Sequence, residues 1–172
     1  MYIVQPMKTL LALLLIPLFP AGCAPADDIP PKNPVRWTIV GDSAARLVAS
    51  GKAVHVVLEA DIAKGWHIYS LTQKPGGPIP LRIQLTGASD VSVRGAIEGP
   101  KPVKKFDQNF KLETELYRGK PRFTVPVGVP AGSVTGKREL QVSARYQACS
   151  DTLCLPPRTE KLAVTLNIKG AG

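Results

Sequence analysis

The chain is poor in sulfur, so the positions of its few cysteines are informative. It has three cysteines in 172 residues, and Cys149 and Cys154 are separated by only the four residues SDTL. Both methionines lie within the first seven residues, so the rest of the chain lacks the thioether ligand that copper sites often use. It also lacks a G-x-S-x-G motif and a glycine-rich phosphate loop, so no motif points to serine catalysis or nucleotide binding.

The sequence lacks any run of basic residues, although its formal net charge is +9. Lysine and arginine are spread along the chain, and aromatic residues make up only 6% of it. Nucleic-acid-binding domains concentrate their basic residues and often interleave them with aromatic ones. We therefore predict no nucleic-acid partner, and attribute the charge to weak attraction to anionic membranes or acidic proteins. No motif calls for a cofactor.

Long apolar runs are also absent after residue 19. The run LLALLLIPLF follows Lys8, contains Pro17 and is too short to span a bilayer, which is typical of a signal peptide. It leads to PAGC, which resembles a bacterial lipoprotein signal with Cys23 as the lipidated residue, although Pro20 departs from that pattern. An ordinary secretory signal cleaved near Ala26 is the alternative, and translation could start at Met1 or Met7. Either signal predicts export to a compartment where disulfides persist.

Residues 1–22 are thus expected to be the signal peptide and residues 23–34, rich in proline, an extended tether. From residue 35 to 170 we expect a single domain made of strands. Three stretches alternate apolar and polar residues with a period of two, namely AVHVVLEADI, LQVSARYQA and KLAVTLNI. Six shorter candidates are VRWTIV, WHIYS, LRIQLT, VSVRG, LETELY and RFTVPV. This predicts an all-β fold, an antiparallel two-sheet sandwich, with a closed barrel as the alternative.

Strand parity places Cys149 on the outward face of its strand with Gln147 and Arg145, and SDTL predicts a hairpin that lets Cys149 and Cys154 form a disulfide near the surface. Closing a loop of about six residues stabilises a fold by only roughly 2 kcal/mol. Such a bond suits a redox-active pair, but a structural hairpin disulfide is an equally good interpretation of the spacing. A metal site is weakly supported, because C-x4-C is not the usual zinc spacing and only His55 and His67 could add imidazoles.

Three segments carry a family resemblance: GWHIYS, FDQNFKLETELYRGKPRFTVPV and YQACSDTLCLPP. In the same order, they resemble the amino-terminal periplasmic domain of the thiol:disulfide interchange protein DsbD, over about Val35 to Ile168. The resemblance implies an immunoglobulin-like sandwich with one redox-active cysteine pair. It also implies two partners: a membrane-embedded electron donor, here expected in trans because the chain ends at Gly172, and thioredoxin-like periplasmic proteins that are reduced.

The resemblance further implies residue roles. Cys154 would form the mixed disulfide with partners and Cys149 would resolve it, while Phe110 would be the aromatic cap over the pair. Trp66, Tyr69 and Tyr146 would line the same site. One departure is that four residues separate the cysteines, where some members have five. We therefore expect a thiol-disulfide oxidoreductase of the protein-disulfide reductase type, in the periplasm or cell envelope and anchored through Cys23. A binding or chaperone-like sandwich with a structural disulfide is the alternative.

Overall fold

The computed structural model describes residues 32–41 and 46–170. The predicted signal peptide, Cys23 and most of the predicted tether lie outside these residues. The described part of the chain consists of strands joined by turns, with no α-helix among them. Accordingly, none of the described residues belongs to a helix long and apolar enough to cross a membrane.

The first sheet is antiparallel and has the strand order β1-β3-β9-β6. Its members are β1 (Val35–Val40), β3 (Ala53–Ile62), β9 (Arg122–Gly128) and β6 (Ser92–Val93). The period of two in β3 turns Val56, Leu58 and Ala60 to one face, where all three are fully buried. β3 pairs with β9 from Ala53 to Glu59 and so carries this apolar face across the sheet.

The second sheet has the order β2-β12-β10-β5. It comprises β2 (Arg46–Ala49), β12 (Arg158–Lys169), β10 (Gly136–Tyr146) and β5 (Arg82–Thr86). β10 and β12 form its long antiparallel centre, in register from the Gly136–Ile168 pair to the Tyr146–Arg158 pair. β2 runs parallel to β12, so the predicted antiparallel arrangement holds for all the described strand pairs except this one.

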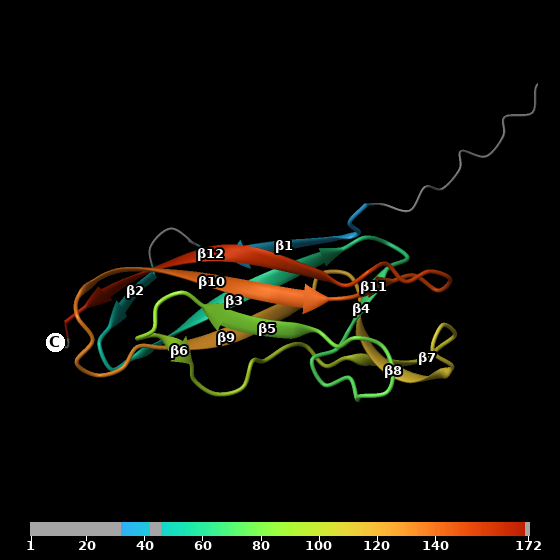
Figure 1. Ribbon diagram of the computed structural model, residues 1–172, viewed down its shortest axis with the longest axis horizontal. Helices are drawn as coiled ribbons and strands as arrows, with labels where there is room; N and C mark the ends of the chain where they lie inside the picture. The colour runs from blue at the N-terminus through green and yellow to red at the C-terminus, as the bar shows by residue number, and fades with distance from the viewer. Residues whose placement is uncertain (1–31, 42–45, 171–172) are drawn as a thin grey trace, which may run out of the picture. The chain divides into compact units, whose positions relative to one another are not determined.

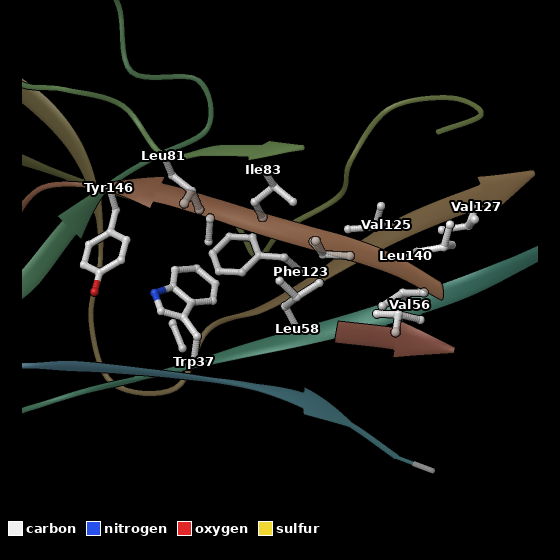
Figure 2. Packing of buried hydrophobic residues seen from close by; sticks show 14 of the residues in the cluster. Trp37, Val56, Leu58, Leu81, Ile83, Phe123, Val125, Val127, Leu140 and Tyr146 are labelled. Carbon is white, nitrogen blue, oxygen red and sulfur yellow. The ribbon is translucent and has the colours of Figure 1, made fainter. Parts of the chain in front are cut away.

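These two sheets bury one common core between them. Figure 2 shows Trp37, Leu58 and Phe123 of the first sheet facing Leu140 and Ile83 of the second. Phe123 is fully buried and its ring centroid lies 5.7 Å from that of Trp37. Burying a side chain of this size stabilises a fold by roughly 1.5–3 kcal/mol. The predicted all-β, immunoglobulin-like sandwich is therefore confirmed, and the closed barrel is not the fold.

A third, smaller sheet was not predicted as a separate unit. Its order is β11-β4-β8-β7, with β11 (Ala148–Cys149), β4 (His67–Tyr69), β8 (Leu112–Tyr117) and β7 (Val103–Asp107). It lies at the right-hand side of Figure 1, where β10 ends. The turn between β7 and β8 and the chain that follows β11 both belong to this end of the domain, and the cysteine pair lies here.

Candidate functional site

The two cysteines face each other across a tight hairpin and form a disulfide. Cys149 ends β11 and forms an isolated antiparallel bridge with Cys154, and their Cα atoms are 4.1 Å apart. The Ser150 amide donates to the Leu153 carbonyl at 2.7 Å, and the Leu155 amide donates to the Ala148 carbonyl at 2.9 Å. These hydrogen bonds on either side of the bridge close the hairpin that the SDTL spacing predicted.

The prediction that Cys149 lies on the outward surface is wrong, because Cys149 is fully buried. β10 ends at Tyr146, and the chain moves into the third sheet, where Ala148 and Cys149 pair with Ile68 and His67 of β4. Ala148 faces the main core, so Cys149 does face the opposite side, as its parity requires. That side is covered by other residues of the third sheet. Cys154, in contrast, is partly exposed.

Two of the predicted site residues, Phe110 and Tyr69, lie against the disulfide. The buried residues Tyr69, Leu116 and Cys149 form a small apolar cluster, and Phe110 and Cys154 pack against it. The half-buried Phe110 ring meets the Tyr69 ring nearly edge-on, at 88° and a centroid distance of 5.9 Å, an arrangement that aromatic pairs favour. We call these five residues the cysteine cluster.

The other two predicted lining residues, Trp66 and Tyr146, belong to the main core and not to the cysteine cluster. The Tyr146 ring packs at 5.7 Å from Trp37, and its hydroxyl donates to Asn33 Oδ1 at 3.1 Å. Tyr146 thus ties the end of β10 to β1 and to Asn33.

Asp107 shapes the turn that carries Phe110. Its Oδ1 accepts hydrogen bonds from the amides of Asn109 at 2.8 Å and Phe110 at 3.3 Å. Its carbonyl accepts the Lys111 amide at 2.7 Å, and Lys111 takes a positive φ of 55° to close the turn. An aspartate that binds backbone amides two and three residues ahead is a common turn-former. We call residues 107–111 the cap turn.

The second oxygen of Asp107 ends a chain of hydrogen bonds that runs from the surface residue Arg118 into the interior. The Tyr69 hydroxyl donates to Asp107 Oδ2 at 2.7 Å, His67 Nε2 lies 3.3 Å from the Tyr69 oxygen, and Arg118 Nη2 lies 3.4 Å from His67 Nδ1. A guanidinium can only donate, so Nδ1 accepts and the Nε2 proton points to Tyr69. The bonds then run in one direction, from Arg118 through His67 and Tyr69 to Asp107.

The protonation states in this chain follow from burial and charge. Burial and the nearby Arg118 lower the pKa of His67 from its ordinary value of 6.5 to about 4, against the opposing effect of Asp107. His67 is therefore neutral near pH 7, and its 3.8 Å approach to Asp107 Oδ2 is not an ion pair. Burial and the hydrogen bond to Asp107 raise the pKa of Tyr69 well above its ordinary value, so its hydroxyl stays a donor.

The cap turn and the cysteine hairpin are also joined at the surface. Asp151, between the two cysteines, pairs with Lys105 of β7 at 2.8 Å and with Arg118 at 3.3 Å. The Asn109 side chain donates to the Ser150 carbonyl at 3.3 Å. A cleft of about 200 Å³ separates the cap turn from the hairpin at this point. The contact between the two is therefore partly polar and solvated, and not a continuous apolar seal.

Sequence reasoning missed several residues of this site. His67 was considered only as a possible metal ligand, and Asp107, Arg118 and Asp151 were not singled out. The one available signal was D-Q-N shortly before the strand-like stretch LETELY, which is typical of an aspartate-led turn. Within residues 32–41 and 46–170, no three histidine, cysteine or acidic side chains are grouped so as to hold a metal ion.

Comparison with known proteins gives the family of the chain. Among solved structures, it is similar to the amino-terminal domain of DsbD from Neisseria meningitidis in its reduced form, with 18% identity, a TM-score of 0.47, and coverage of 69% of this chain and 82% of that one. It is also similar to the amino-terminal periplasmic domain of ScsB from Proteus mirabilis, with 20% identity, a TM-score of 0.47, and coverage of 76% of this chain and 44% of that one. No curated protein sequence matches it. The model of the family "thiol:disulfide interchange protein DsbD, N-terminal" matches residues 38–166. The chain belongs to this family of DsbD amino-terminal domains.

Proposed function

We propose that the domain relays reducing equivalents from a membrane-embedded thiol-disulfide donor to thioredoxin-like proteins through Cys149 and Cys154. The observation that carries the proposal is a disulfide packed beneath an aromatic residue, Phe110, in a chain of the DsbD amino-terminal family. This makes the chain a thiol-disulfide oxidoreductase of the protein-disulfide reductase type.

The unequal burial of the cysteines supports different roles for them. In the delivery step, the Cys154 thiolate of the reduced domain attacks one sulfur of the partner's disulfide, which forms a mixed disulfide and releases the partner's other sulfur as a thiolate. The Cys149 thiolate then attacks Cys154 Sγ, closes the domain's own disulfide and expels the second partner sulfur. Two electrons leave the domain, and the partner takes up two protons. Cys154 is the partly exposed cysteine and Cys149 the fully buried one, which suits attack on a partner by Cys154.

Phe110 acts as a cap in this scheme. Thiol-disulfide exchange requires access to the sulfur that is attacked. Phe110 packs against the cluster that holds both cysteines, and it lies on a turn and not within a strand. Phe110 can therefore be displaced without breaking the β7–β8 pairs from Val103–Leu116 to Phe106–Glu113. A partner that moves the turn gains access, whereas small oxidants meet the aromatic ring.

Export and anchoring complete the proposal, and the amino-terminal sequence supports them. LLALLLIPLF followed by PAGC directs the chain out of the cytoplasm, and Cys23 carries the lipid that holds the domain at a membrane of the periplasm or cell envelope. Incorporation of a labelled fatty acid tests this. Label should appear in the intact chain and disappear in Cys23→Ala; equal labelling of both would rule out Cys23 as the attachment site.

Trapping of mixed disulfides tests the exchange function. In Cys149→Ser, the resolving thiol is missing, so Cys154 should hold its partner in a covalent complex that a reductant releases. Cys154→Ser is the matched control, because it keeps one cysteine of the pair but in the buried position. Thioredoxin-like proteins should accumulate with Cys149→Ser and not with Cys154→Ser. Equal trapping by both variants, or by neither, would contradict the proposed roles.

A structural disulfide in a binding module is the competing function. The hairpin closes only a short loop, so the bond itself adds roughly 2 kcal/mol to stability. The Cys149→Ser/Cys154→Ser double variant separates the two. A redox carrier keeps its fold and loses all electron transfer, whereas a binding module loses about that stability and keeps its ligand.

A further inference from the structure

Asp107 occupies an unusual position for a carboxylate, because it is only 5% exposed and both of its oxygens are engaged by different parts of the site. Oδ1 holds the amides of Asn109 and Phe110 in the cap turn, while Oδ2 holds the Tyr69 hydroxyl. Burying a charged group is costly unless hydrogen bonds satisfy it. The cost is met here by bonds that all fix the cap turn or a residue of the cysteine cluster.

The interior partner of Asp107 is itself held in place. Tyr69 is fully buried in the cysteine cluster, and its hydroxyl oxygen accepts a hydrogen bond from His67 Nε2. His67 in turn accepts a hydrogen bond from Arg118 at Nδ1. His67 and Cys149 are paired residues of β4 and β11, so their side chains share a face of the third sheet. Asp107 thus joins the cap turn to a fixed set of side chains next to the buried cysteine.

The geometry separates this link from the surface ion pairs beside the cap turn. Asp151 pairs with Lys105 and Arg118 where the side chains are 37–65% exposed, and exposed ion pairs contribute little. Hydrogen bonds to a buried charged acceptor are stronger. The position of Phe110 therefore depends more on the buried Asp107 than on the visible surface pairs.

We propose that Asp107 is a positioning residue for the cap: its Oδ1 keeps Phe110 over the Cys149–Cys154 pair, and its Oδ2 fixes the carboxylate against Tyr69. The inference deepens the proposed exchange function and rests on it for its biological meaning. Asp107 touches no reacting atom. It sets the fraction of molecules in which the cap turn is displaced and the disulfide can be reached.

Two substitutions divide the functions of the carboxylate. Asp107→Asn keeps an oxygen for the cap-turn amides but places an amide group toward Tyr69, whereas Asp107→Ala removes both sets of bonds. Glu113→Gln is the matched control, since Glu113 is an exposed carboxylate on the adjacent strand β8 that pairs with Lys104 at the surface. Circular dichroism and thermal unfolding establish whether each variant is folded. If Asp107→Ala does not fold, the measurements are made on Asp107→Asn alone.

Three measurements are made, the first two on the oxidised domain and the third on the reduced domain. The first is the hydrogen exchange of the Asn109 and Phe110 amides, the second is the rate of disulfide reduction by a small phosphine, and the third is the rate at which the domain reduces an oxidised disulfide isomerase of the thioredoxin fold. In Asp107→Ala we expect amide exchange and phosphine reduction to be about tenfold faster, the factor that corresponds to about 1.4 kcal/mol. Asp107→Asn should show a smaller increase, and Glu113→Gln none.

A double-mutant cycle distinguishes positioning from general loosening of the fold. If Asp107 acts through Phe110, then Asp107→Asn accelerates phosphine reduction in the parent domain but not in Phe110→Ala, where no cap remains to be moved. Equal acceleration in both backgrounds would overturn the proposal, as would amide exchange and phosphine rates within twofold of the parent for both Asp107 variants.

The design also separates this inference from the exchange function. Suppose that the amides and the phosphine rate respond as expected, but neither the reduced parent nor the reduced variants reduce the disulfide isomerase. The positioning role of Asp107 then stands and the proposed electron relay fails. If the parent domain reduces the disulfide isomerase and Asp107→Ala leaves the amides and all rates unchanged, the relay stands and the positioning role fails.

Discussion

The buried imidazole of His67 makes the stability of the domain depend on pH in a defined window. The folded domain keeps His67 neutral down to about pH 4, while the ordinary value that applies to the unfolded chain is 6.5. Between these values the unfolded chain binds more protons than the folded one. The free energy of unfolding therefore falls as pH is lowered from about 6.5 to about 4, and the contribution levels off below that.

The magnitude follows from the two pKa values. Each pKa unit corresponds to about 1.4 kcal/mol, so moving from the ordinary 6.5 to about 4 gives a loss of about 3 kcal/mol across the window. The full penalty applies to a side chain only 2% exposed, so solvent screening does not reduce it much. Single domains are stable by only about 5–15 kcal/mol, which makes this loss large enough to measure.

Urea unfolding of the parent and of His67→Gln at several pH values tests the prediction. Glutamine has both a hydrogen-bond acceptor for Arg118 and a donor for Tyr69 but does not titrate in this range. The fold lowers the pKa values of some carboxylates, such as Asp90 and Asp151. Their protonation at low pH destabilises the parent and the variant equally, so it cancels when the two are compared. From pH 7 to pH 4, the free energy of unfolding of the parent should fall by about 3 kcal/mol more than that of His67→Gln. His55→Gln is the matched control, because it replaces an exposed histidine that takes no part in the hydrogen bonds from Arg118 to Asp107. Parallel curves for the parent and His67→Gln would show that His67 does not cause the loss of stability.

Other predictions concern charge and packing. Arg118→Gln removes a cation that lowers the pKa of His67, so an NMR titration should find that pKa raised above about 4; no change would mean that burial alone sets it. Phe123→Ala empties a fully buried position between Trp37 and Tyr117 and should lower the free energy of unfolding in urea by about 3–5 kcal/mol, whereas a loss below about 1 kcal/mol would contradict the packing. Asp151→Asn breaks exposed ion pairs and should cost less than about 1 kcal/mol by the same assay; a larger loss would show that the surface link holds the domain together.

The sequence predicted the sandwich because its longest strands bury one face. β3, β10 and β12 alternate cleanly, and a period of two is a direct consequence of a half-buried strand. β7 was missed since its residues VKKFD are exposed except for Asp107, so no apolar alternation marks it. β11 has only two residues, which is too short for any pattern. The third sheet therefore followed from tertiary pairing that local sequence does not encode.

The site was only partly predictable for a related reason. Parity correctly put Cys149 opposite Ala148, but it cannot say what covers that face, and Phe110 and Tyr69 come from distant segments. His67 is two residues from Tyr69, yet its partners Arg118 and Asp107 lie far along the chain. Contacts between charged and buried residues that lie far apart in the sequence cannot be inferred from residue spacing. The cysteine pair itself was found because a short C-x4-C spacing is a local feature.

In the proposed relay, Cys149 and Cys154 open and close as a redox pair. Equilibrating the domain with glutathione buffers, and with the thioredoxin couple for lower potentials, measures its reduction potential directly. We expect a reversible dithiol with a potential well above about −300 mV, the limit below which structural disulfides of exported proteins typically lie. A pair that remains oxidised below about −300 mV would contradict the proposed relay and give the bond a structural role.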